Sequence, residues 1–175
     1  KLGFNTENVQ KTDEGYIVEG DILLTQSELS GLPTSNEIVY AEEEHYRTTN
    51  LVTGLPRTIT VSLNTTQANF VAATDEAIRR YNALNLRVRF QRVSSGANIR
   101  IVTFFENSNV LGSAGFPSGG NPFGQIRMNT RFYTPSAAVN PLATTIAHEM
   151  GHCIGFRHTD YMNRSFSCGG VAVNE

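Results

Sequence analysis

The sequence predicts an α+β fold in which a mixed, twisted sheet carries two long helices. Runs of alternating apolar and polar residues recur along the chain, as in strands with one solvated face, and two longer stretches carry apolar residues at the spacing of helix turns. These elements follow the order strand, helix, strand, strand, loop, strand and helix. The 175 residues, 39% of them hydrophobic, allow one domain of ordinary size plus a smaller appendage.

The first fifty residues differ in kind from the rest, and we interpret them as that appendage, ahead of a domain over residues 51–175. Two short apolar runs, Tyr16–Glu19 and Ile22–Thr25, are separated by Gly20 and Asp21, which form a turn signal common in hairpins. A stretch containing Thr, Ser and Pro follows, and then an acidic run.

Regular elements begin at Arg57. Strands are expected at Arg57–Asn64, Leu86–Val93, Asn98–Phe105 and Gln125–Asn129, and helices at Gln67–Leu84 and Pro141–Phe156. Thr65 or Thr66 can cap the first of these helices. The segment Leu111–Gly124 is rich in Gly, Ser and Pro, as loops are.

The motif HEMGHCIGFRH begins in the second helix at His148 and ends just after it at His158. His148 and His152 are four positions apart, so their imidazoles lie on one helix face and can reach a single metal ion. Glu149 projects beside that pair, where its carboxylate can take a proton from a water molecule activated by zinc. Gly155 can adopt the left-handed conformation that ends a helix, which lets the chain bring His158 back to the same ion.

The histidines are concentrated in this motif, because the chain has only four and three of them fall there. Single histidines on helices are usually packed or solvated, but three at this spacing, with Glu and Gly in the matching positions, favour a zinc site with an open fourth position.

The motif HEMGHCIGFRH resembles the extended zinc motif H-E-x-x-H-x-x-G-x-x-H of the metzincin metallopeptidases. It is more similar still to a bacterial group of HEIGH-type metallopeptidases, through Cys153 and the residues that follow the third histidine. The resemblance implies an endopeptidase that acts on protein or peptide substrates, with one Zn²⁺ held by His148, His152 and His158 and with Glu149 as the base. Residues 51–175 would supply the upper lobe of a two-lobed catalytic domain, with a mixed twisted sheet, a backing helix and an active-site helix.

Substrate contacts are also implied by the resemblance. In metzincins an edge strand above the cleft pairs with extended substrate, and the corresponding residues here are Ser113, Ala114, Gly115 and Phe116. An unpaired sheet edge can accept a peptide as another strand. The alternative is that this stretch is an ordinary Gly-rich loop.

The N-terminal segment contains Val18-Glu19-Gly20-Asp21-Ile22, which resembles the F-x-G-D-I element of astacin propeptides. In that family the aspartate occupies the open zinc position and keeps the zymogen latent. The resemblance implies that Asp21 is a fourth zinc ligand in a latent form, because a carboxylate there displaces the nucleophilic water. The alternative is that Gly20 and Asp21 only form a turn between two strands.

The two cysteines bear on the compartment. A disulfide between Cys153 and Cys168 would be worth about 3 kcal/mol in the chain-entropy model and would indicate an oxidising, secreted, periplasmic or cell-surface location. The other possibilities are a free buried thiol at Cys153 and a zinc thiolate.

Composition and length restrict the partners. The net charge of −2 predicts no nucleic-acid partner, and no apolar run approaches the 18 residues of a membrane span. Met162 follows His158 too closely to form the methionine turn of the metzincins, so we expect a missing C-terminal lobe, supplied by a longer protein or by a C-terminal fragment of the same precursor. The second function class is an inactive or binding domain with structural zinc.

Overall fold

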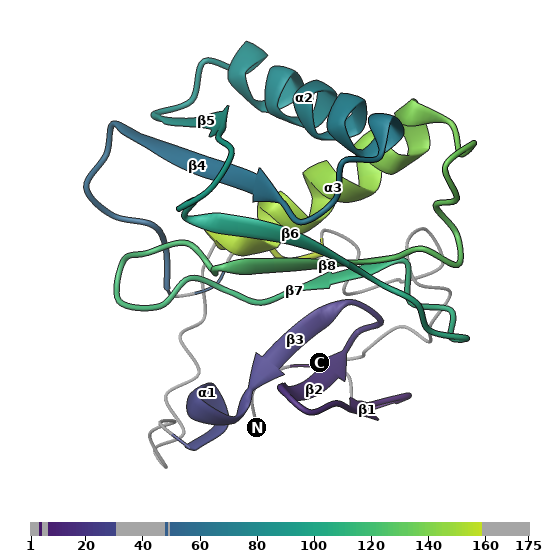
Figure 1. Cartoon of the computed structure of the whole chain (residues 1–175). Coiled ribbons are helices and arrows are strands. Elements are labelled where there is room, and N and C mark those ends of the chain that lie inside the picture. Colours follow the sequence, from purple (N-terminus) through teal and green to yellow (C-terminus); the bar gives the residue numbers. More distant parts are fainter. Residues whose placement is uncertain (1–3, 5–6, 31–47, 49, 159–175) are drawn as a thin grey trace.

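The computed structural model describes residues 4, 7–30, 48 and 50–158, and these form eight strands and three helices. The strands are β1 (Gln10–Lys11), β2 (Gly15–Val18), β3 (Ile22–Thr25), β4 (Arg57–Leu63), β5 (Val88–Arg92), β6 (Ile99–Phe104), β7 (Gly112–Ala114) and β8 (Gln125–Asn129). The helices are α1 (Gln26–Ser30), α2 (Ala68–Ala83) and α3 (Val139–Ile154). All of the strands belong to one sheet, in the order β1-β2-β3-β7-β8-β6-β4-β5 (Figure 1).

The predicted α+β class is confirmed, and the four strands expected after residue 57 are all present. β4 pairs in parallel with both β5 and β6, and β6 pairs in parallel with β8. β7 pairs antiparallel with β8, so the sheet is mixed, as expected. This strand lies within the Gly-rich segment that the local pattern describes as a loop.

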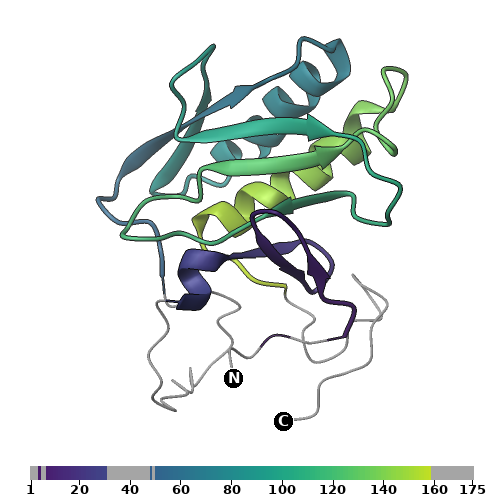
Figure 2. The ribbon, with the colours of Figure 1, turned by 60° about the horizontal axis from the view of Figure 1, so that its bottom comes forward.

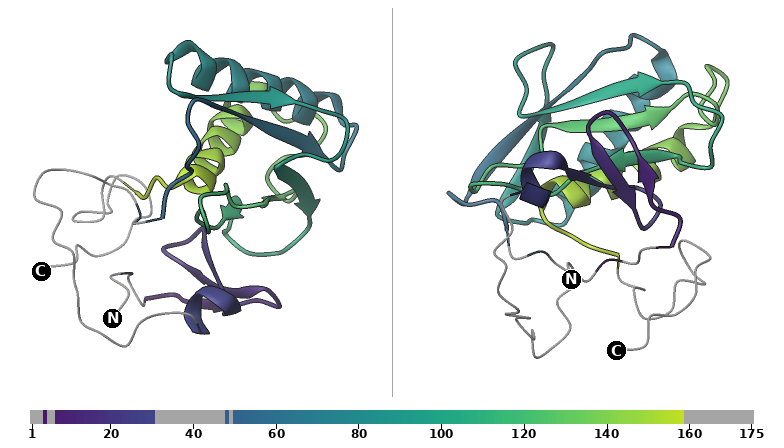
Figure 3. Two further views of the ribbon diagram at one scale, coloured as in Figure 1. Left: turned by 90° about the vertical axis from the view of Figure 1, so that its left-hand side faces the viewer. Right: turned by 90° about the horizontal axis from the view of Figure 1, so that it is seen from below.

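The two long helices lie on the same face of the sheet and pack against each other (Figures 1 and 3). They and the sheet share one apolar core. Its fully buried members include Ile59 and Val61 from β4, Ile99 and Ile101 from β6, Phe70 and Ala77 from α2, and Leu142, Ile146 and Met150 from α3. The buried face of α3 thereby fixes the direction in which its other residues point.

The start of each long helix differs slightly from the prediction. α2 has Gln67 at its N-cap, and the threonine cap is wrong because both threonines precede that position; Thr65 Oγ1 instead accepts a hydrogen bond from the Gln67 amide at 3.3 Å. α3 begins at Val139, two residues before the predicted Pro141. A proline fits inside the first turn because no intrahelical amide bond is required there.

The N-terminal strands extend the sheet beyond β7, on the side that faces away from β8 (Figures 1 and 2). β2 and β3 form an antiparallel hairpin in which Val18 lies opposite Ile22. β3 then joins β7 in parallel, with Ile22 opposite Ala114. Of the helices that the structure describes, none combines the length and apolar character needed to cross a bilayer.

The helix–sheet core gives a first prediction. Leu142→Ala should lower the free energy of unfolding by about 2–5 kcal/mol, because it leaves a cavity where Leu142 is fully buried. The matched control is Leu84→Ala, at a leucine that is 63% exposed, which should change stability by less than about 0.5 kcal/mol. Urea denaturation of the two variants measures the difference; equal effects would contradict the packing described here.

Candidate metal centre

The last two turns of α3 carry the first two histidines of the motif. His148 and His152 are one turn apart and lie off the core-facing stripe of the helix, with side-chain exposures of 40% and 2%. At the end of the helix Gly155 has φ 111°, in the left-handed region. The Gly155 and Phe156 amides donate to the carbonyl oxygen of Gly151 at 3.1 and 2.9 Å, which closes the helix and turns the chain. This turn brings His158 back beside the first two rings.

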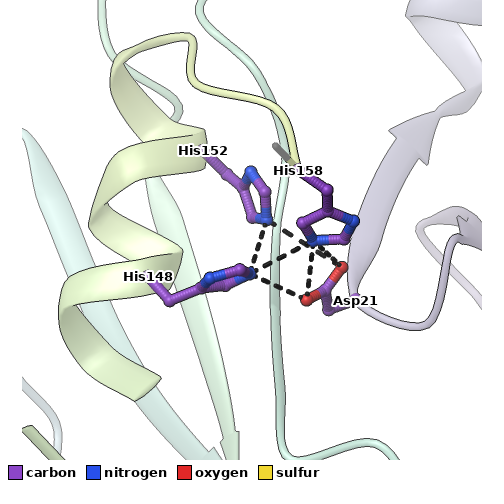
Figure 4. A group of neighbouring side chains, drawn as sticks. All are labelled: Asp21, His148, His152 and His158. Atoms are coloured by element: carbon purple, nitrogen blue, oxygen red, sulfur yellow. Dashed lines mark hydrogen bonds and ion pairs between the residues drawn. The ribbon is translucent and has the colours of Figure 1, made fainter. Parts of the chain in front are cut away.

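Four donor atoms converge at this point: the Nε2 atoms of His148, His152 and His158 and the carboxylate of Asp21 (Figure 4). His148 Nε2 lies 3.0 Å from His152 Nε2 and 3.2 Å from His158 Nε2. The Asp21 oxygens lie 3.0 Å from His148 Nε2, 3.1 Å from His158 Nε2 and 3.9 Å from His152 Nε2. Ligand atoms at about 2.0–2.1 Å from a tetrahedral Zn²⁺ would be about 3.3 Å apart, so the spacing fits such an ion.

The tautomer of His152 supports this assignment. Its Nδ1–H donates to the carbonyl oxygen of Phe156 at 2.7 Å, which leaves the lone pair of Nε2 facing the other donors in the neutral ring. A carbonyl partner on the remote nitrogen is the usual arrangement for a metal-bound histidine. The donor set of three imidazoles and one carboxylate suits Zn²⁺ among the common metals.

Asp21 reaches the histidines from the turn between β2 and β3. The two residues before it, Glu19 and Gly20, both have positive φ, and the Asp21 carbonyl accepts a hydrogen bond from the Ala114 amide at 3.1 Å. Burial alone would raise the pKa of Asp21, but its contacts with the three histidines outweigh this and hold the pKa well below the usual value. Asp21 is therefore an anionic donor. The sequence left open whether Gly20 and Asp21 form a hairpin turn or place a carboxylate at the histidines. The two are compatible, because these residues form the turn and the turn presents the Asp21 carboxylate to the histidines.

Glu149 lies beside the four donors without belonging to them. Its side chain is buried, and in the described part of the chain its Oε2 has no hydrogen-bond partner. Burial, together with the negative charge of Asp21, raises its pKa well above the usual value. A β-carbon at Gly112 would lie 3.2 Å from Glu149 Oε1, so the glycine leaves room for the carboxylate next to β7.

The residues expected to bind substrate lie on and after β7, and all are buried. Ser113 and Ala114 belong to the strand itself, and Gly115 and Phe116 follow it. The edge on which a substrate was expected is occupied by β3 of the same chain. A β-carbon on Gly115 would lie 3.0 Å from the Leu23 carbonyl oxygen and 2.8 Å from the Phe123 ring, so the glycine permits this close approach.

Phe116 follows β7 and contacts one of the histidines. Its ring meets the His152 ring edge-on, with the centroids 5.8 Å apart. It also forms a second apolar cluster with Val18, Ile22 and Leu24, against which Phe4 and Leu29 pack. Every member of this cluster except Phe116 comes from the N-terminal segment.

The predicted disulfide finds no support. Cys153 is a free thiol, fully buried in the main core with Ile146 and Met150, and Cys168 lies outside the described residues. Burial raises the pKa of the Cys153 thiol well above its usual value, and the nearby Glu149 adds to this. The α3 periodicity explains the outcome: Cys153 follows Ile146 by two turns and therefore faces the core. It is not among the metal-binding group either.

Sequence reasoning missed Glu19. This side chain is buried, with its Oε2 3.6 Å from His158 Nδ1 and its Oε1 3.5 Å from Arg157 Nη2. The only signal in the sequence was its position two residues before Asp21.

The site is a zinc-type histidine motif at the end of a helix that packs on a mixed sheet, as metal-dependent hydrolases carry it. The chain belongs to the dual-action HEIGH metallopeptidase family, whose model matches residues 16–175. This confirms the resemblance to HEIGH-type enzymes.

Similar solved structures include two of myroilysin. One is 18% identical, with a TM-score of 0.49, and the match covers 64% of this chain and 53% of that one. The other is 19% identical, with a TM-score of 0.46, and the match covers 66% of this chain and 50% of that one. This chain therefore spans about half the length of these structures. No curated protein sequence matches it.

The helix end gives a second prediction. Gly155→Ala should lower stability by about 1–3 kcal/mol, because alanine is strained at this φ and its β-carbon would lie 2.6 Å from Leu51 Cδ2. The same change should weaken metal binding by moving His158. Gly96→Ala is the matched control, since Gly96 also has positive φ but open space around it. Thermal unfolding and zinc titration of both variants test this; an unchanged zinc affinity in Gly155→Ala would contradict the role of the turn.

The cysteine gives a third prediction. The unreduced protein, once denatured, should show a reactive thiol at Cys153, whereas a Cys153–Cys168 disulfide would leave none. In a Cys168→Ser variant, Cys153 should resist a thiol reagent while the protein is folded, because the thiol is buried and protonated. Mass spectrometry of the labelled peptides measures both; rapid labelling of the native variant would argue against the buried position.

Proposed function

We propose that this chain is the catalytic part of a secreted zinc endopeptidase, captured in a latent form in which Asp21 occupies the fourth zinc position. The observation that carries the proposal is the convergence of three imidazole nitrogens and one carboxylate at 3.0–3.9 Å, with His152 held in the metal-binding tautomer. Family membership supports a metal-dependent peptidase. The metzincin clan, the choice of zinc and secretion are parts of the proposal.

The protein groups divide the work of peptide hydrolysis. A Zn²⁺ ion at this site would polarise the scissile carbonyl and lower the pKa of a water molecule to about 7. Glu149 would take the proton of that water on its carboxylate and pass it to the leaving amine. Its buried position beside the four donors suits this role, since it keeps the carboxylate out of bulk water and close to where the zinc-bound water would lie.

The N-terminal segment would block the active site in three ways. Asp21 takes the ligand position that water needs, and β3 pairs with the strand on which a substrate would lie. Ile22 and Leu24 cover Phe116, next to His152. In the active form, an extended peptide would replace β3 on β7 and contact Ser113, Ala114, Gly115 and Phe116.

This arrangement matches a division into a propeptide over residues 1–50 and a catalytic domain over residues 51–175. A C-terminal lobe, present in the same precursor or supplied as a fragment, would complete the substrate cleft. The residues beyond His158 that would connect to it lie outside the described part of the chain.

The second candidate is an inactive domain with structural zinc. One observation favours it: with Asp21 in place the site has four protein ligands, as structural zinc sites do. The buried Glu149 carboxyl group favours the peptidase. Burying its Oε2 without a hydrogen-bond partner costs free energy, and a purely structural metal site does not require such a group.

The fourth prediction separates the two candidates. Asp21→Ala should bind one zinc and cleave casein at least roughly tenfold faster than the parent, because a form held closed keeps only about 0.1–10% of its population competent. Limited proteolysis near Arg47 should increase the rate further. Casein cleavage is measured together with the zinc content of each sample.

Asp21→Ala combined with Glu149→Gln is the control. It should retain zinc but fall back to the background rate, since the amide cannot accept the proton. If zinc-loaded Asp21→Ala stays inactive even after proteolysis, the peptidase proposal fails for this chain and the structural site is favoured.

A further inference from the structure

Glu19 is a buried acid in an unusual backbone conformation. Its side chain is 1% exposed, and its φ of 57° lies in the left-handed region that favours glycine. Most turns place Gly, Asn or Asp at such a position. A long acidic side chain that is both strained and removed from water requires specific partners to hold it there.

Two contacts of Glu19 are with the segment that carries the third histidine. Oε1 lies 3.5 Å from Arg157 Nη2, and Oε2 lies 3.6 Å from His158 Nδ1. The opposite nitrogen of the same imidazole, Nε2, lies 3.1 Å from Asp21 Oδ1 within the group of metal donors. Glu19 therefore stands behind the His158 ring, on the side away from the proposed metal.

We propose that Glu19 is a positioning residue for the metal centre: its carboxylate orients the His158 ring and makes Nε2 a stronger donor. A carboxylate or carbonyl on the remote nitrogen is the usual second partner of a metal-binding histidine. For His152 this partner is the Phe156 carbonyl, from the end of its own helix. For His158 it is a side chain from the N-terminal hairpin, 139 residues earlier in the chain than His158.

This assignment couples the hairpin to the metal through two residues. Asp21 offers a ligand atom, and Glu19 supports a ligand from behind. Because coupling between two binding events is reciprocal, docking of the hairpin strengthens metal binding and the metal strengthens docking. The inference rests on the proposed metal site but not on catalysis, so its test does not require peptidase activity.

The experiment measures zinc affinity by competition with a chelator, using the full chain. Glu19→Gln keeps the shape of the side chain and removes its charge, and it should weaken zinc binding roughly tenfold to hundredfold. Glu14→Gln is the matched control: Glu14 lies on the same segment, is exposed, and contacts Gln125 rather than a histidine. It should bind zinc like the parent.

A second variant distinguishes two possible roles of Glu19, which are orienting the His158 ring and attaching the hairpin to the rest of the domain. Arg157→Met removes the ion pair with Glu19 but leaves the carboxylate beside His158, so it should lose less zinc affinity than Glu19→Gln. If Arg157→Met loses as much, Glu19 acts only by holding the hairpin in place, and the proposal is overturned.

A spectroscopic measurement provides the readout that a purely structural role would leave unchanged. In the Co²⁺-substituted protein, the Nδ1 protons of the ligand histidines give shifted, exchangeable NMR signals. Glu19→Gln should speed solvent exchange of the His158 signal and leave that of His152 unchanged, since the latter proton is bound to Phe156. Unaltered His158 exchange together with parental zinc affinity would overturn the proposal.

Discussion

Three imidazole nitrogens and a carboxylate face one another at 3.0 to 3.9 Å, a donor set that a bound cation would hold together. His152 cannot relieve the crowding by offering a proton from Nε2 while its ring is neutral, because its one N–H is committed to the Phe156 carbonyl. The other features of the domain serve this convergence. The apolar face of α3 packs on the sheet and fixes the helix, Gly155 ends the helix and returns His158, and the β2–β3 turn delivers Asp21.

The sequence predicts the part of the metal centre that lies within the His148–His158 motif. His148, His152 and Glu149 lie on one helix and are placed by helical periodicity, whereas His158 follows the left-handed cap at Gly155 by three residues and is placed by that turn. Asp21 was identified only through its resemblance to a propeptide element. Glu19 and the pairing of β3 with β7 depend on contacts between segments about ninety or more residues apart, which a local pattern does not contain. The disulfide prediction finds no support for a related reason: the spacing to Cys168 allowed a loop, whereas helix packing turns Cys153 into the core, and Cys168 lies outside the described residues.

The N-terminal hairpin is part of the same sheet as the rest of the domain, and this pairing would stabilise the proposed latent form. Three kinds of contact hold the hairpin beside the histidines. They are the parallel pairing of β3 with β7, the apolar cluster around Phe116, and the side chains of Glu19 and Asp21. The hydrophobic contacts are non-directional and supply affinity, whereas the charged contacts are directional and fix the register of the hairpin against the histidines. Under the proposed function, a substrate that replaces the hairpin would have to supply both kinds of contact, or would depend on removal of the segment beforehand.

The most direct test of the central claim is zinc X-ray absorption of the full chain loaded with one equivalent of Zn²⁺. We expect a four-coordinate first shell of nitrogen and oxygen at about 2.0–2.1 Å, with the outer-shell scattering of imidazole rings. We also expect no sulfur at about 2.3 Å, since Cys153 lies in the core. A sulfur ligand, a six-coordinate shell without imidazole, or failure to retain zinc would contradict the assignment of His148, His152, His158 and Asp21 as the metal site.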